Sequence, residues 1–143
     1  DLKYKEYNIP VELDLPCGWE SQGTDKMKRA DETTGPVYEI LAQSCDCMTL
    51  MSYRDSYDKV YSLGYAPLQA GSKYGTKVNF GFEFGNSGEV QTVDFHDEDR
   101  YYAYNQIKQT MLKIERKDWN CQVGFAIHSM KGWYDLRPTG YKQ

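Results

Sequence analysis

Several acidic, hydroxyl and imidazole side chains in this sequence stand at or near the ends of short apolar runs. Glu83, Tyr53 and His128 each close such a run, and Asp14 lies near the end of another. Folds that alternate strands and helices place catalytic groups at the carboxyl ends of parallel strands. Carboxylates there can act as nucleophiles or as general acids and bases. These four residues are therefore the candidate catalytic groups.

The apolar runs that position these residues are predicted to be β-strands, at residues 11–15, 47–53, 78–83 and 123–128. Helical patterns fill the gaps between the strands, at residues 36–44, 55–63, 67–74 and 98–117. The last of these repeats apolar residues at three- and four-residue steps: Tyr104, Ile107, Met111 and Ile114. Long loops are expected at residues 17–35 and 84–95, where residues 89–95 could make a small β-excursion. The distance between successive runs suits βαβ units, which take roughly 30 residues or more. The sequence thus predicts one domain, residues 1–143, made of four β/α units with parallel strands.

Side chains alternate along a strand, and here each run has one bulky apolar face and one small or polar face. In the third run, Phe80 and Phe82 oppose Gly81 and Glu83. A doubly wound sheet is covered by helices on both faces and needs both to be apolar. A barrel strand packs on helices only at its outer face. The pattern favours parallel β/α units that form about half of a TIM (β/α)8 barrel over an open sheet.

Four strands cannot close a barrel. We therefore expect either a fragment of a larger barrel or a half that another copy or a second chain completes. In such a sheet, neighbouring strands lie about 4.8 Å apart. If they follow chain order, Tyr53 and His128 flank Glu83, and Asp14 lies roughly 10 Å from Glu83.

Three further residues are candidates for binding substrate. Trp19 and Trp133 follow the first and fourth strands, where indole rings could stack on sugars, and loop packing is the alternative. Arg54 follows the second strand directly. An ion pair between Glu83 and Arg54, or another cation, is the structural alternative to catalysis. His128 could hold a substrate hydroxyl or the Glu83 carboxylate, or be a hydrogen-bonded core histidine.

Composition excludes several classes of function. The net charge of −4 without a basic stripe argues against a nucleic-acid partner. No apolar run approaches the roughly 18 residues of a membrane span. No phosphate or dinucleotide fingerprint is present, so no cofactor is expected. Four cysteines match no zinc pattern, and they are either buried thiols or one or two disulfides of a secreted protein: Cys17, Cys45, Cys47 and Cys121.

Four stretches of the chain resemble the C-terminal half of (β/α)8-barrel proteins of the glycoside hydrolase type: VELDLPCGWE, CDCMTLMSYRD, KVNFGFEFG and VGFAIHSMKGWYDL. They are similar to the fifth to eighth strands of a largely uncharacterised bacterial family. The resemblance implies that Glu83 ends the seventh strand as the nucleophile. Tyr53 could donate a hydrogen bond that orients it. The general acid of such enzymes ends the fourth strand, outside this sequence. Asp14 is the alternative within the chain, and its distance suits inversion.

The resemblance implies a carbohydrate-active, glycoside hydrolase-like enzyme that takes a carbohydrate ligand and works outside the cell or at its surface. The alternative is a non-catalytic carbohydrate-binding or surface protein. A small open αβ domain with a binding role is a third possibility. The substrate and the linkage do not follow from the sequence.

Overall fold

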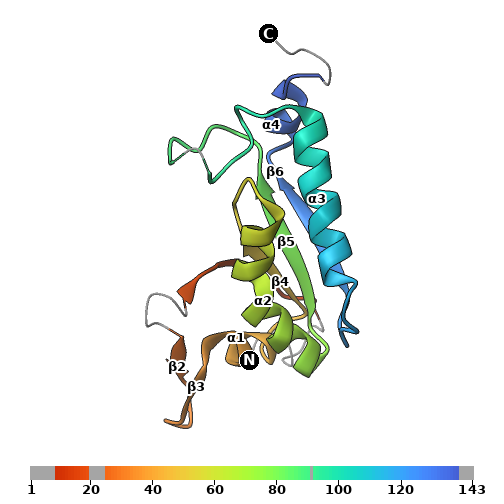
Figure 1. The fold of residues 1–143 in the computed structure, drawn as a ribbon. Helices are drawn as coiled ribbons and strands as arrows, with labels where there is room; N and C mark the ends of the chain where they lie inside the picture. The colour runs from red at the N-terminus through yellow and green to blue at the C-terminus, as the bar shows by residue number, and fades with distance from the viewer. Residues whose placement is uncertain (1–8, 20–24, 91, 139–143) are drawn as a thin grey trace.

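The computed structural model describes residues 9–19, 25–90 and 92–138, and a four-stranded sheet runs through this part of the chain (Figure 1). All neighbouring strands are parallel and lie in chain order: β1 (Glu12–Pro16), β4 (Cys47–Met51), β5 (Lys77–Glu83) and β6 (Val123–His128). The prediction of an α/β fold with four parallel strands is therefore confirmed. The second strand ends at Met51 rather than at Tyr53.

The helices of the described residues connect or follow these strands: α1 (Val37–Ala42), α2 (Tyr57–Tyr74), α3 (Arg100–Ile114) and α4 (Met130–Asp135). Crossovers between parallel neighbours are almost always right-handed, so strands in chain order carry α1, α2 and α3 on one face. Figure 1 shows α2 in front of the sheet and α3 alongside β6. The core lies between the helices and this face, where the most buried strand side chains are Met48, Leu50, Val78, Phe80 and Phe82.

Helix α2 is continuous, although the sequence predicts a break before Pro67. A proline inside a helix costs about 3 kcal/mol because it lacks an N–H and crowds the preceding turn. Here Pro67 and Leu68 are fully buried beside the sheet, and this burial offsets the cost. A side chain at Gly64 would collide with the Phe80 ring, so α2 approaches β5 closely there. The helix ends at Tyr74 and is capped by Gly75, whose φ of 73° is left-handed.

Helix α3 buries only half of the apolar stripe that its spacing predicts. Ile107 and Ile114 pack on the core, whereas Tyr104 and Met111 are 59% and 38% exposed. Gln106 and Thr110 are buried as well. Gln106 has a specific partner, because its Oε1 accepts a hydrogen bond from the Tyr57 N–H at 2.9 Å. A polar contact to the start of α2 therefore helps to set the rotation of α3.

Two loop predictions need correction. Residues 17–35 contain a short antiparallel hairpin, β2 (Lys26–Lys28) with β3 (Thr34–Pro36), where the sequence predicts only a loop. The small β-excursion predicted after β5 is not found in the described residues 84–90 and 92–95. That segment is organised by side-chain hydrogen bonds instead.

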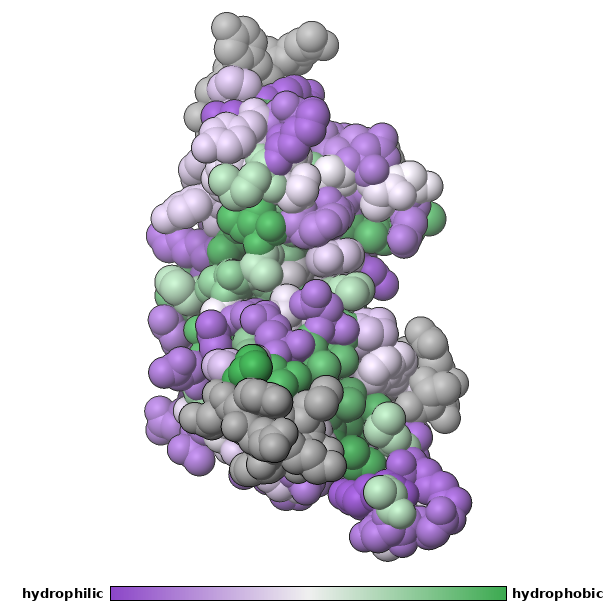
Figure 2. Space-filling view, turned by 180° about the vertical axis from the view of Figure 1, so that it is seen from behind, coloured by the Kyte–Doolittle hydropathy of each residue, from purple (hydrophilic) through white to green (hydrophobic). Residues whose placement is uncertain are grey.

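The second face of the sheet carries polar and small side chains, and none of the connecting helices covers it. Glu12, Asp14 and Met51 are exposed on this face, and Thr49 and Asn79 are half-buried. Seen from behind, the molecule exposes apolar residues between hydrophilic ones (Figure 2). Among the residues that the structure describes, no helix is long and apolar enough to cross a membrane.

Candidate functional site

Two of the predicted residues meet where β5 and β6 end. Glu83 and His128 are register partners and the last residues of their strands. The parallel register places both side chains on the face that the connecting helices leave uncovered. Their exposure differs sharply, at 10% for the Glu83 side chain and 66% for that of His128. The carboxylate therefore lies behind the imidazole.

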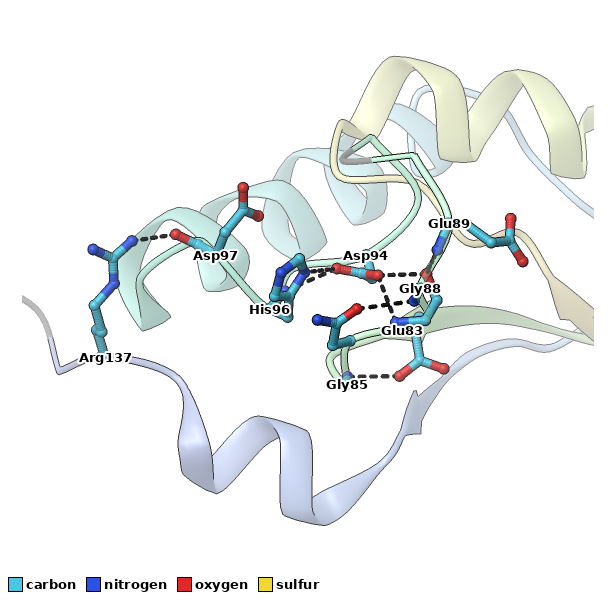
Figure 3. A network of polar contacts seen from close by, with 10 residues as sticks. Glu83, Gly85, Gly88, Glu89, Asp94, His96, Asp97 and Arg137 are labelled. Atoms are coloured by element: carbon cyan, nitrogen blue, oxygen red, sulfur yellow. Dashed lines mark hydrogen bonds and ion pairs between the residues drawn. The ribbon is translucent and has the colours of Figure 1, made fainter.

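The Glu83 carboxylate is held at both oxygens. Its Oε1 accepts a hydrogen bond from the Gly85 N–H at 2.6 Å (Figure 3), and its Oε2 contacts His128 Nδ1. Arg54 is not its partner, since Arg54 Nη1 donates to the Tyr53 carbonyl at 2.5 Å. The ion-pair alternative thus involves a histidine and a backbone N–H rather than Arg54. A carboxylate fixed at both oxygens has a defined orientation.

Tyr53 lies just beyond β4 and packs on the same pair. Its ring stacks on His128 with centroids 6.0 Å apart and planes at 18°. Gly81 leaves room for it, since a Cβ there would lie 3.1 Å from the Tyr53 ring. Burial, followed by the charges of Glu83 and Asp14, raises the pKa of Tyr53 above its ordinary value. The described contacts of Glu83 do not include the hydrogen bond that we expected from Tyr53.

A hollow of about 300 Å³ lies on the uncovered face beside this group. Asp14, Tyr53 and His128 line it together with Met51 and Ala126. Three of the four candidate catalytic residues thus share one hollow, and the fourth, Glu83, contacts His128 directly. This arrangement can place a small polar ligand against a hydroxyl, a carboxylate and an imidazole.

A second hollow, of about 400 Å³, lies between α1 and α2. Tyr38, Glu39 and Lys73 are among its lining residues, and Glu39 and Lys73 form an ion pair at 2.7 Å. It contains none of the residues predicted to do chemistry. We therefore place the candidate site at the strand ends.

The two tryptophans predicted to stack on sugars both pack on protein rings. Trp19 stacks on Tyr38 with ring centroids 5.3 Å apart, and Trp133 meets Phe84 edge-on at 5.1 Å. Both are partly buried against the core. Neither lines the hollow that contains Tyr53 and His128. Their geometry matches the loop-packing alternative.

Sequence reasoning missed a polar layer below the hollow. The Asn79 amide donates to Thr49 Oγ1 at 3.0 Å and contacts Cys47 Sγ at 3.3 Å, and Thr49 bonds to Glu12. Burial raises the pKa of the Cys47 thiol, which keeps it protonated and poorly nucleophilic. The available signal was the alternation of the strands, which places these polar side chains on one face.

A second missed group organises the loop after β5. Asp94 is 1% exposed and accepts hydrogen bonds from the Ser87 N–H at 2.9 Å and the His96 N–H at 3.1 Å (Figure 3). Burial acts to raise its pKa, but bonds from Ser87 and His96 outweigh burial and lower the pKa to about 2. Ligand-type atoms of Asp94, His96 and Asp97 lie within 4.8 Å of one another, a spacing that a metal could use. Both Asp94 oxygens already have protein donors, and these hydrogen bonds tie Ser87 to His96 across the loop.

The chain was also compared with known proteins. No protein-family model, curated protein or solved structure matches it. The likeness to glycoside hydrolase barrels therefore remains a prediction from the sequence.

Proposed function

We propose that this chain is part of a carbohydrate-active, glycoside hydrolase-like protein in which Glu83 is the nucleophile. The observation that carries the proposal is the Glu83 carboxylate itself. It ends a parallel strand, where barrel enzymes place catalytic groups, and Gly85 and His128 fix both of its oxygens. The adjoining hollow presents a hydroxyl and a second carboxylate, the groups that a sugar ring would meet.

The neighbouring residues supply supporting roles in this proposal. Tyr53 keeps its proton because its pKa is raised, so its hydroxyl can donate to a sugar oxygen or to Glu83. His128 orients Glu83 through Nδ1 and presents Nε2 to a ligand. Retaining enzymes need a second carboxyl group about 5–5.5 Å from the nucleophile, and inverting enzymes one at about 6.5–9.5 Å. The strand register corrects the expected place of Asp14, which pairs with Thr49 and through it lies level with Asn79, four residues before Glu83. Because strands rise about 3.3 Å per residue, Asp14 lies farther from Glu83 than the roughly 10 Å expected, so the second carboxyl group would come from the completing half of the barrel.

We infer further that the sheet is half of a (β/α)8 barrel in the working protein. The strands lie in chain order, the connecting helices lie on one face, and the opposite face carries a polar layer. In a closed barrel that polar face would line the interior. The completing half would come from the same protein, a second copy or another chain.

Thiol labelling tests the half-barrel. Met51 is 42% exposed on the uncovered face, so a Met51→Cys variant of the isolated chain should react rapidly. In the complete protein, the barrel interior should protect the same thiol from the reagent. The intact mass of that protein should be larger by the additional half. If the thiol at position 51 reacts equally fast in the well-folded 143-residue chain and in the natural protein, the barrel is ruled out.

Glycan hydrolysis by the complete protein tests the chemistry. Glu83→Gln keeps an oxygen to accept the Gly85 N–H but removes the nucleophile. Turnover of a glycan panel should fall by roughly 10²-fold or more, since the covalent step is lost. Glycan binding without turnover in the wild type would instead support the carbohydrate-binding alternative.

A further inference from the structure

A short segment of chain contacts one oxygen of Glu83 and packs on the peptide that binds the other. His128 stands at the start of this segment and contacts Oε2. Gly132, in α4, stands at its end and packs on the peptide that joins Phe84 to Gly85. That peptide carries the N–H that donates to Oε1 at 2.6 Å. The ribbon of α4 passes beside Gly85 in Figure 3.

The contact at Gly132 has no room for a side chain. A Cβ on Gly132 would lie 2.5 Å from both Gly85 N and Phe84 C, and 2.7 Å from Phe84 O. All three atoms belong to the backbone, so no side-chain rotation could relieve the overlap. An alanine at this position must displace either α4 or the Phe84–Gly85 peptide.

Phe84, which precedes this N–H, is restrained through its own N–H and its ring. The Phe84 N–H donates to the His128 carbonyl at 2.6 Å, and Phe84 is 1% exposed. Its ring stacks on Phe95 at 5.2 Å and meets Trp133 at 5.1 Å. Helix α4 closes the remaining side through Gly132. Contacts on Phe84 and Gly132 therefore restrain the Phe84–Gly85 peptide, which carries the Gly85 N–H.

We propose that Gly132 is a positioning residue for Glu83. Its missing side chain lets α4 seat the Gly85 N–H on Oε1, while His128 holds Oε2. The effect of Gly132 on catalysis rests on the function proposed for Glu83. The contact between Gly132 and the Phe84–Gly85 peptide does not depend on that function. The segment from His128 to Gly132 thus orients the carboxylate as one unit.

The test compares Gly132→Ala with Gly71→Ala in the complete protein. Gly71 is an equally tight glycine, since a Cβ there would lie 2.8 Å from the Thr76 carbonyl. It packs beside the other end of β5, so it controls for a general loss of packing. The readouts are the Gly85 amide signal and its hydrogen exchange by NMR, with kcat and KM for glycan hydrolysis.

We expect Gly132→Ala to accelerate Gly85 exchange by about tenfold or more, the effect of losing a typical hydrogen bond to a charged group. It should lower kcat by a similar factor and leave KM unchanged. Gly71→Ala should change neither. A folded Gly132→Ala protein with an unchanged Gly85 amide would overturn the inference.

Two further outcomes are distinguishable. If the wild type hydrolyses no glycan while the Gly85 amide responds as expected, the positioning contact stands and the proposed function fails. If Gly132→Ala does not fold, Trp133→Leu loosens α4 from Phe84 without adding bulk at position 132. Faster Gly85 exchange in Trp133→Leu would support the inference, and unchanged exchange would overturn it.

Discussion

Glu83 and His128, the last residues of two adjacent parallel strands, are joined through Oε2 and Nδ1. The carboxylate is 10% exposed and the imidazole 66%, so a ligand in the hollow meets His128 before Glu83. Binding of Nδ1 by the carboxylate leaves Nε2 for that ligand. The pair can therefore work with Glu83 as nucleophile, or with His128 as the proton-transfer group that Glu83 orients.

Replacing His128 separates these roles. His128→Asn removes one of the two contacts that orient Glu83, while Gly85 still holds the other oxygen. If Glu83 is the nucleophile, kcat should fall by only about tenfold, the effect of losing one hydrogen bond to a charged group. Steady-state kinetics beside Glu83→Gln give the comparison. A loss as large as that of Glu83→Gln would instead assign the proton transfer to His128.

Tyr53 should respond differently to loss of its hydroxyl and loss of its ring. Tyr53→Phe keeps the stacking on His128 and should change the free energy of unfolding by less than about 0.5 kcal/mol. Tyr53→Leu removes the aromatic pair and should cost about 0.5–1.5 kcal/mol more. Urea titration of both variants measures the difference. Equal costs would show that the ring contact contributes little.

The raised pKa of Tyr53 should make the stability of the protein depend on pH in the alkaline range. Its folded pKa is raised above the ordinary value of 10.0, so the unfolded chain loses this proton first. Stability should therefore fall as the pH rises above about 10, and Tyr53→Phe should remove part of that fall. Unfolding measured from pH 9 to 11 checks this, and identical profiles would contradict it.

Asp94 should make the free energy of unfolding decrease at acid pH. Its pKa is lowered from 3.8 to about 2 in the folded chain, so its contribution is complete above pH 3.8 and is lost as the pH falls towards 2. The difference amounts to about 2 kcal/mol. Urea unfolding of Asp94→Asn across this range should show a shallower slope than the wild type. Asp97→Asn, in the same loop, is the control, and an equal slope for Asp94→Asn would refute the assignment.

The stabilisation from His96 should depend on pH in the opposite direction to that from Asp94. The hydrogen bond to Asp94, and then the charges of Asp94 and Asp97, raise its pKa above 6.5. Its stabilisation is therefore present below pH 6.5 and is lost as the pH rises through the folded value. NMR titration should find that the pKa of His96 falls in Asp94→Asn. A pKa that does not move would show that Asp94 is not the cause.

The sequence was sufficient to predict the four parallel strands and the residues that end two of them, Glu83 and His128. Runs such as residues 78–83 alternate between bulky apolar and polar side chains, and this pattern survives in β5 because its helix-facing side forms the core. Chain-order pairing then brings His128 beside Glu83 without further information. Local pattern and tertiary structure agree in this part of the chain.

The remaining features depend on contacts between distant segments. Pro67 continues a helix because its burial outweighs the local cost, and Gln106 is buried in α3 because the Tyr57 N–H donates to it. Gly132 matters only because the Phe84–Gly85 peptide lies against it. Such contacts leave no periodic signal in the sequence. A glycine in a short helix does not indicate which segment will pack against it.

Covalent trapping tests the central role of Glu83 most directly. The complete protein would be incubated with a panel of 2-deoxy-2-fluoro glycosides, which stall retaining enzymes at the glycosyl-enzyme stage, and digested for mass spectrometry. We predict that the sugar is attached to Glu83 and that Glu83→Gln carries no label. A protein that hydrolyses glycans while its label lies on another residue, or forms nowhere, would contradict the account.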